Sequence, residues 1–360
     1  MYSAAEYEPL FIDAHNIDTF RKDAGSHVYV DAFSRQVREL FLIDTPARAE
    51  EKKEEAYKSR AFDEYLQRME GEFMHVYYPW NRHLVKTVGA DDYFRLKTNR
   101  NQDIITADEQ KKLYAYRVAV FGLSVGSNIL FALTQSGISH EVIIADFDEL
   151  DTTNLNRIMA GVHQIGLNKC VVSARHVYED NPFASVTALI KGVDAYALEA
   201  LLRNKKIDCI VDEVDDIAFK IKARILAMKH RVPIVMVTDN GDGVVLHVER
   251  YDLGCATIFG RKPSDMQEMI HGPLTKEQAG RFIMEMIVGG ADKVDSAMLA
   301  SVKRVLAHEL VSWSQLGSAA LLGGVVATYI IKHIALGKNE QTDIRAYLSP
   351  SSCKWSTHAD

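Results

Sequence analysis

Residues 142–157 read Val-Ile-Ile-Ala-Asp-Phe-Asp-Glu-Leu-Asp-Thr-Thr-Asn-Leu-Asn-Arg, an apolar run followed by a polar one. The apolar run predicts a buried strand, and Asp146 then stands at the carboxyl end, where parallel sheets bind ligands. Arg157 and Lys169 follow at distances that a loop and a helix can cover. One acid suits a ribose and two cations suit phosphates, so the combination predicts chemistry on a nucleoside triphosphate.

Outward from this stretch, short β-branched runs alternate with helical patterns from residue 117 onward. Such alternation predicts an α/β fold: a Rossmann-like, doubly wound, mostly parallel sheet covered by helices. The expected strands are 118–121, 142–145, 186–190, 208–211, 233–237 and 244–248, and later helices are expected at about 275–289, 292–310 and 318–334.

The first 95 residues lack this rhythm and are rich in charged and aromatic side chains. We therefore expect a mainly helical N-terminal accessory region at 1–95, a nucleotide-binding domain at 96–350 and a tail at 351–360. The apolar run 316–336 contains Lys332, His333 and many small residues, which favours a buried helix over a membrane span.

Composition narrows the class of protein. Of 360 residues, 47% are hydrophobic and 25% charged, as in folded globular proteins, and the formal net charge of -7 does not favour nucleic acid as a partner. The four cysteines form no Cys-x-x-Cys pair, and the N-terminus is polar and acidic, unlike a secretion signal. We expect a cytoplasmic protein with neither nucleic-acid nor membrane partners.

The first expected strand runs into a glycine loop, Gly-Leu-Ser-Val-Gly at 122–126. Gly122, Ser124 and Gly126 can let backbone N–H groups approach a phosphate at the positive end of a helix. The same letters spell Gly-x-Ser-x-Gly, the nucleophile elbow of α/β-hydrolases, which also needs an acid and a later histidine. Asp146, about 20 residues on, favours the nucleotide loop. A tight helix start without a ligand is the third interpretation.

Carboxylates gather after the strand expected at 208–211, in Asp-Glu-Val-Asp-Asp at 212–216. Close carboxylates are costly unless a cation neutralises them, and Mg²⁺ bound through one or two carboxylates plus phosphate oxygens fits this position. We assign the metal to Asp215 and the capping of the following helix to Asp216.

This ordered set of residues resembles the ThiF/MoeB family of adenylating enzymes, relatives of the ubiquitin-activating enzymes. The family's ribose acid matches Asp146, its Asn-Leu-x-Arg motif matches 154–157, and its helix-borne lysine matches Lys169. Its Asp-x-x-Asp-Asn turn matches 212–216, with Asp216 in place of asparagine. Upstream, Arg100 matches the arginine that reaches the ATP site of the neighbouring subunit.

The resemblance implies an ATP-dependent adenylyltransferase that activates a carboxylate as an acyl adenylate and releases pyrophosphate. The substrate it implies is the C-terminus of a peptide or of a small ubiquitin-like protein, and the assembly is a homodimer. Lys169 would stabilise the developing charge, Asp215 would orient Mg²⁺, and Arg100 would act across the dimer interface. The implied nucleotide-binding residues are Gly122, Ser124, Gly126, Asp146, Asp148, Asn154, Arg157 and Lys169.

Departures from the family keep two other interpretations open. The zinc-binding Cys-x-x-Cys pairs are missing, so we predict no structural zinc, and Cys255 is expected to be packed rather than to accept an acyl group. An NAD-dependent oxidoreductase would bind NAD(H) without depending on Lys169 or Asp215. A catalytically inactive interaction module would bind ATP without releasing pyrophosphate.

Overall fold

The structure is a computed structural model that describes residues 4–352 except 24, 51–52, 271 and 273. The chain forms two compact units: Met1–Lys111 with Ala174–Ala184, and Lys112–Ser173 with Ser185–Asp360. Helix α6, Ala107–Ala115, and helix α8, Lys169–Asp180, each run from one unit into the other. Each unit is therefore built from segments that are not contiguous in sequence.

The first unit combines helices with a four-stranded sheet in the order β1-β3-β4-β2, which the sequence analysis did not identify. Its core packs Val37, Leu40 and Phe41 of α2 against Phe62 and Tyr65 of α4. The strands are β1 (Leu10–Ile12), β2 (Val28–Asp31), β3 (Phe73–Tyr78) and β4 (His83–Val88), and the helices are α1 (Ile17–Asp23), α2 (Phe33–Asp44), α3 (Lys53–Ala56), α4 (Arg60–Arg68) and α5 (Ala90–Thr98).

The segment Ala174–Ala184 belongs to this first unit through polar contacts with the N-terminal residues. Trp80 donates its Nε1–H to Glu179 Oε1 at 2.5 Å. Asp180 pairs with Lys97, and its backbone carbonyl accepts a hydrogen bond from the Tyr93 hydroxyl. The last turn of α8 is thus fixed to the N-terminal region.

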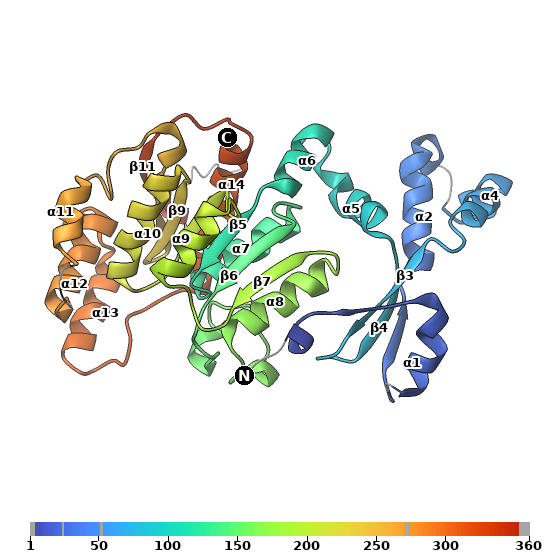
Figure 1. Cartoon of the computed structure of the whole chain (residues 1–360), viewed down its shortest axis with the longest axis horizontal. Helices are drawn as coiled ribbons and strands as arrows, with labels where there is room; N and C mark the ends of the chain where they lie inside the picture. Colours follow the sequence, from blue (N-terminus) through green and yellow to red (C-terminus); the bar gives the residue numbers. More distant parts are fainter. Residues whose placement is uncertain (1–3, 24, 51–52, 271, 273, 353–360) are drawn as a thin grey trace, which may run out of the picture. The chain divides into compact units, whose positions relative to one another are not determined.

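The second unit is a seven-stranded sheet in the order β11-β10-β9-β8-β5-β6-β7 (Figure 1). β7, β6, β5, β8 and β9 are parallel, which confirms the predicted doubly wound fold. β10 is antiparallel to both β9 and β11, and the sequence analysis did not identify β11. The strands are β5 (Val118–Phe121), β6 (Glu141–Ala145), β7 (Ser185–Leu189), β8 (Cys209–Asp212), β9 (Ile234–Asn240), β10 (Gly243–Glu249) and β11 (Asp343–Leu348).

Helices cover the sheet on the faces that strand alternation dictates. Ala119 and Phe121 of β5 pack in a core with α9 and α10, whereas the intervening Val120 lies under Gly126 of α7. The remaining helices of this unit are α7 (Val125–Gln135), α9 (Ala195–Arg203), α10 (Ile217–His230), α11 (Pro263–Glu268), α12 (Lys276–Phe282), α13 (Ser296–Leu306) and α14 (Gly317–Ala335).

Helix α14 is the apolar run that was expected to form a buried helix. Small residues let it lie close to its neighbours: a Cβ at Gly324 would come 2.7 Å from the Asn128 carbonyl oxygen of α7, and one at Gly323 would come 3.0 Å from Val237 of β9. By length and composition this helix could cross a membrane, but 56% of its most apolar 18-residue stretch is buried inside the fold. Its packing on α7 and β9 agrees with the predicted core helix.

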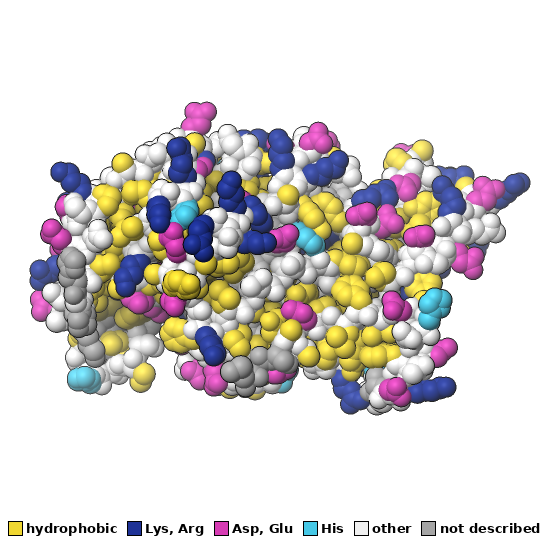
Figure 2. Space-filling model, in the orientation of Figure 1, with side chains coloured by type: hydrophobic (Ala, Val, Ile, Leu, Met, Phe, Trp, Pro, Cys, Tyr) yellow, Lys and Arg dark blue, Asp and Glu magenta, His cyan; other side chains and the backbone are white. Residues whose placement is uncertain are grey.

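Charged side chains of both signs are mixed on the face drawn in Figure 2, where Lys and Arg are interspersed with Asp and Glu. This distribution matches the mild formal net charge of -7. The face presents no continuous basic stripe of the kind that tracks a nucleic-acid backbone.

Candidate functional site

A cavity of about 670 Å³ opens at the carboxyl ends of β5 and β8, where the strand order reverses. This position is the usual ligand site of doubly wound sheets. The cavity brings together six of the residues singled out in the sequence: Ser124, Asp148, Asn154, Arg157, Lys169 and Asp215.

Gly122 and Gly126 of the glycine loop shape the cavity without lining it. Gly122 adopts φ +88°, and a Cβ there would lie 2.3 Å from the Glu213 carbonyl oxygen. A Cβ at Gly126 would meet Val120 Cγ1 at 2.9 Å. Both glycines therefore serve close packing, while Ser124 and Val125 bring the amino end of α7 to the cavity. The helix dipole makes this end favourable for an anion.

Asp146, the expected ribose acid, lies just beneath the cavity surface. Its Oδ2 accepts a hydrogen bond from the Leu123 amide at 2.7 Å, and its Oδ1 accepts one from the Asp148 amide at 2.9 Å. Burial raises the pKa of Asp146 above its usual value, although Lys169 opposes this. Asp146 thus ties the glycine loop to the following loop, and the carboxylate that lines the cavity is Asp148.

Lys169 and Asp148 form an ion pair in the cavity wall, with Nζ 2.7 Å from Oδ2. Lys169 is the first residue of α8, and its side chain is 9% exposed, whereas that of Asp148 is 53% exposed. The ammonium group is therefore held at a fixed place while its partner remains accessible to a ligand.

Arg157 connects the glycine loop to the loop that follows β6. Its Nε donates to Ser124 Oγ at 2.8 Å, and its Nη1 donates to the Thr153 carbonyl at 3.1 Å. Burial lowers the pKa of Arg157, and the carboxylates of Asp239 and Asp215 oppose that shift. Because Ser124 Oγ accepts from a cation, and no histidine is among the described residues lining the cavity, the geometry does not support a nucleophile elbow.

The two neighbouring aspartates of the acid turn after β8, Asp215 and Asp216, have different environments. Asp216 caps α10, because its side chain accepts hydrogen bonds from the amides of Ala218 and Phe219. Asp215 is left to line the cavity. The lining holds more acids than cations, with Asp148, Glu149, Asp151, Glu213, Asp215 and Asp239 against Arg157, Lys169 and Lys220.

Asp239 lies in the run Thr-Asp-Asn-Gly-Asp-Gly at 238–243, whose place after an expected strand is consistent either with a substrate pocket or with a plain turn. It stands near the end of β9, lines the cavity and is 4% exposed. Neither carboxylate oxygen has a hydrogen-bond partner of good geometry among the described residues. Burial raises the pKa of Asp239 to about 6, while Arg157 and Gln315 nearby lower it. The only signal in the sequence was its place at the end of an expected strand.

A buried charge network lies under the cavity floor. Arg224 is fully buried and pairs with Asp212 at 2.5 Å and with Glu249 at 2.6 Å. Lys220 also contacts Asp212, with Nζ 3.3 Å from Oδ1. Burial alone would raise the pKa of Asp212, but Lys220 and Arg224 hold it below its usual value. Two cations thus balance two carboxylates and join α10 to β8 and β10.

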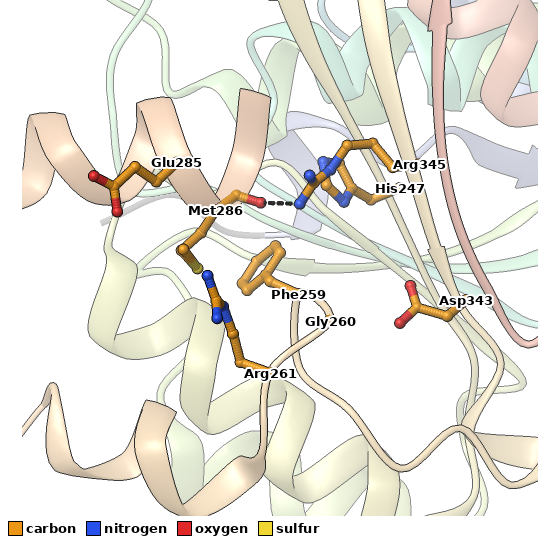
Figure 3. A pocket seen from close by; sticks show the side chains of 8 residues that line it. All are labelled: His247, Phe259, Gly260, Arg261, Glu285, Met286, Asp343 and Arg345. Atoms are coloured by element: carbon orange, nitrogen blue, oxygen red, sulfur yellow. Dashed lines mark hydrogen bonds between the residues drawn. The ribbon is translucent and has the colours of Figure 1, made fainter. Parts of the chain in front are cut away.

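A second cavity of about 280 Å³ lies on the other side of a π-helical turn, Ile283–Val288 (Figure 3). Ile283 and Ile287 of this turn line the first cavity, and Glu285 and Met286 line the second. His247 donates from Nε2 to the Ile287 carbonyl at 2.7 Å, and Arg345, which points at the turn in Figure 3, donates from Nη2 to the Met286 carbonyl at 2.6 Å. Side chains of β10 and β11 therefore fix this shared wall.

Two groups of predicted residues do not line the first cavity. Arg100 is exposed in a short helical turn, Asn99–Asn101, of the first compact unit and does not line the cavity. Cys170, Cys209 and Cys255 are buried, and burial raises the pKa of each thiol. Cys255 is thus packed, as expected, while Cys353 lies outside the described residues.

The sequence was compared with known protein families and curated proteins, and the structure with solved structures. The profile of the ThiF family matches residues 96–354. "Uncharacterized protein MT1398" of Mycobacterium tuberculosis (strain CDC 1551 / Oshkosh) is 29% identical over 327 residues, which cover 89% of this chain and 42% of that protein. Ubiquitin-like modifier-activating enzyme 5 of Bombyx mori is 32% identical over 104 residues, 29% of this chain and 26% of that enzyme. The chain spans less than half the length of either relative.

Solved structures share the fold. The E. coli tRNA N6-threonylcarbamoyladenosine dehydratase TcdA in complex with ATP aligns with a TM-score of 0.50 and 17% identity, covering 70% of this chain and 98% of that one. Its complex with AMP aligns with the same score and identity and covers 99% of that chain. At this identity the likeness concerns the fold alone.

Proposed function

The chain belongs to the ThiF family, and we propose that it is an ATP-dependent adenylyltransferase that activates a carboxylate as an acyl adenylate. One observation carries the proposal: Arg157, Lys169 and the amino end of α7 converge on a single cavity at the switch point of the sheet. Three positive groups around one space suit a triphosphate better than the pyrophosphate of a dinucleotide alone.

In the proposed reaction, a carboxylate oxygen of the substrate attacks the α-phosphorus of ATP. A new P–O bond forms, the bond from the α-phosphorus to the oxygen bridging to the β-phosphate breaks, and pyrophosphate leaves with the electron pair. The protein's contribution is positioning and charge neutralisation. Arg157 and Asn154 hold the phosphates, and Lys169 stabilises the charge that develops on the transferred and leaving groups.

The ribose has two candidate partners at neighbouring positions. We assign the hydroxyl contact to Asp148, whose side chain is 53% exposed at the cavity wall. Asp146 then acts as a positioning residue, because its two oxygens already hold the amides of Leu123 and Asp148.

The described residues hold no cluster of three or more metal-ligating side chains, so a divalent cation here would be bound through one or two carboxylates and the phosphate oxygens of the nucleotide. Asp215 is the residue proposed to hold Mg²⁺, which when bound neutralises phosphate charge. The substrate class suggested by the family is the C-terminus of a peptide or small protein. None of the three described cysteines lines the cavity, so we do not assign the acyl acceptor to any of them.

The test is ligand-dependent thermal stabilisation by Mg·ATP and by NADH. Saturation near 100 times Kd raises stability by about 2.7 kcal/mol, so a shift is easily measured. We expect Mg·ATP to stabilise the parent and Lys169→Ala to lose most of that shift. Lys222→Ala is the matched control, because Lys222 is exposed on α10 and does not line the cavity.

Two other outcomes point to other functions. Stabilisation by NADH alone would overturn the proposal in favour of a dehydrogenase. Stabilisation by ATP without pyrophosphate exchange on any carboxylate would instead favour an inactive nucleotide-binding module.

A further inference from the structure

The cavity has a second, apolar part that the nucleotide assignments leave unused. We call it the apolar wall, and it consists of Ile283, Ile287, Met298, Val305, Val311 and Trp313. These residues come from the π-helical turn, from α13 and from the segment 307–316 that joins α13 to α14. Arg157 and Lys169, the cations assigned to the phosphates, lie instead in the loop after β6 and at the start of α8. The cavity therefore has a polar part and an apolar part.

The apolar wall continues to the mouth of the cavity. Val311 is fully exposed and Trp313 is 45% exposed, although both are large and apolar. Exposed apolar side chains beside a cavity are typical of ligand sites. The segment that carries them is held in place: the Ser314 amide donates to Ser301 Oγ at 3.1 Å, and Asn156 Nδ2 donates to the Gln315 carbonyl at 2.8 Å.

Asp239 adds a polar requirement to the same cavity. Among the described residues, neither oxygen of its buried carboxylate has a hydrogen-bond partner of good geometry. The Gln315 side chain approaches Asp239 without meeting that geometry, and Arg157 donates to Ser124, Thr153 and Asn156 instead. A buried acceptor without a donor is costly, so a ligand that brings an N–H group is favoured here.

We propose that the acyl substrate is an amino-acid carboxylate with a bulky apolar side chain, which the apolar wall binds while Asp239 accepts a hydrogen bond from the α-nitrogen. This inference rests on the proposed function and narrows it from carboxylates in general. A free apolar amino acid and a peptide ending in one both present this chemistry. A tail ending in glycine brings no side chain to the apolar wall.

The experiment is ATP–pyrophosphate exchange with matched acids. Leucine against glycine tests the apolar wall, leucine against 4-methylpentanoate tests the α-nitrogen, and Gly-Gly-Leu against Gly-Gly-Gly tests the peptide form. We expect each leucine compound to exceed its matched acid by at least about tenfold in kcat/KM. The form that exchanges better, leucine or Gly-Gly-Leu, identifies the source of the carboxylate.

Variants assign the two contacts separately. Trp313→Ala and Val311→Ser should shrink the leucine-to-glycine ratio by lowering kcat/KM for leucine more than for glycine. Val311→Ser is safe for folding because that side chain is fully exposed. Asp239→Asn should shrink the leucine-to-4-methylpentanoate ratio while leaving the leucine-to-glycine ratio in place.

Failure of the inference differs from failure of the proposed function. Equal exchange on glycine and leucine compounds, unaffected by the wall variants, would overturn the inference while adenylation itself stands. No exchange on any acid of the panel, with Mg·ATP stabilisation intact, would also overturn it, because the panel contains the acids it names. Loss of the Lys169-dependent ATP shift would remove the proposed function as well.

Discussion

At the scale of single residues, Asp239 is an unfavourable group that the fold tolerates at its candidate site. The pKa of this carboxylate is about 6 in the folded protein and about 4 in the unfolded chain, so ionisation of Asp239 lowers the free energy of unfolding as the pH rises. Below about pH 4 both states hold the proton, and between 4 and 6 the unfolded chain releases it first. The whole penalty is then present above about pH 6.

We therefore predict that Asp239→Asn stabilises the ligand-free protein at pH 7.5 by on the order of 2 kcal/mol, and that this gain disappears near pH 4. Chemical denaturation of both proteins across this pH range measures the difference. Asp242→Asn, an exposed change in the turn that follows β9, should change the free energy of unfolding by less than about 0.5 kcal/mol at either pH. A gain of equal size at both pH values would mean that charge is not the cause.

Residues with a local signal were predictable, and those defined by tertiary burial were not. Asp146, Arg157, Lys169 and Asp215 follow strand ends or lie at helix starts, so sequence spacing alone brings them toward one sheet edge. Asp239 lies in a run that a plain turn explains equally well, so its burial in the cavity could not be inferred from the sequence, and Gln315, which lines the same cavity, comes from about 75 residues further along the chain. Sequence alone also could not show that Asp148 rather than Asp146 lines the cavity. That difference arises because the carboxylate of Asp146 accepts hydrogen bonds from the amides of Leu123 and Asp148.

At the scale of elements, α10 is joined to the sheet by charge as well as by apolar packing. Arg224 lies between Asp212 of β8 and Glu249 of β10, and its Cζ is 3.9 Å from the centre of the Phe259 ring. Removing one partner from a buried ion pair leaves an uncompensated charge in the interior.

We predict that Arg224→Met destabilises the protein by about 3–5 kcal/mol in urea denaturation. Lys222→Met, an exposed change on the same helix, should stay within about 0.5 kcal/mol of the parent. Adding Glu249→Gln to Arg224→Met should recover part of the loss, because Glu249 is left without its cation whereas Asp212 keeps Lys220. A loss below 1 kcal/mol for Arg224→Met would contradict the network's role.

The central strands could be predicted because their β-branched runs are buried on both faces. The strands that were missed have mixed or exposed patterns: all four residues of β2 are exposed, and β11 alternates exposed and partly buried positions. β11 is defined by a partner distant in sequence, since it pairs with β10 across about 100 residues, whereas β3 and β4 form a local hairpin that was missed because their residues do not alternate regularly between buried and exposed.

At the scale of the whole molecule, the expected homodimer makes the role of Arg100 testable. If Arg100 acts in the partner's site, a mixed dimer of Arg100→Ala and Asp215→Ala subunits keeps one intact site. Random pairing of equal amounts makes half of the dimers mixed, so co-expression should restore about a quarter of parental adenylation.

Each variant alone should be strongly impaired, and the mixture should exceed the mean of the two. Activity of the mixture equal to that mean would show that Arg100 serves its own subunit or none. Light scattering on the same samples establishes whether dimers form, so that a monomer is not mistaken for a failed exchange.

Helix α8 contributes residues to both compact units. Its first residue, Lys169, belongs to the candidate site, while Glu179 and Asp180 in its last turn bind the N-terminal region through Trp80, Tyr93 and Lys97. A protein cut at residue 95 would therefore lose Trp80 and Tyr93, which contact Glu179 and the Asp180 carbonyl. Truncation of the N-terminal region thus exposes the last turn of the same helix whose first residue is Lys169.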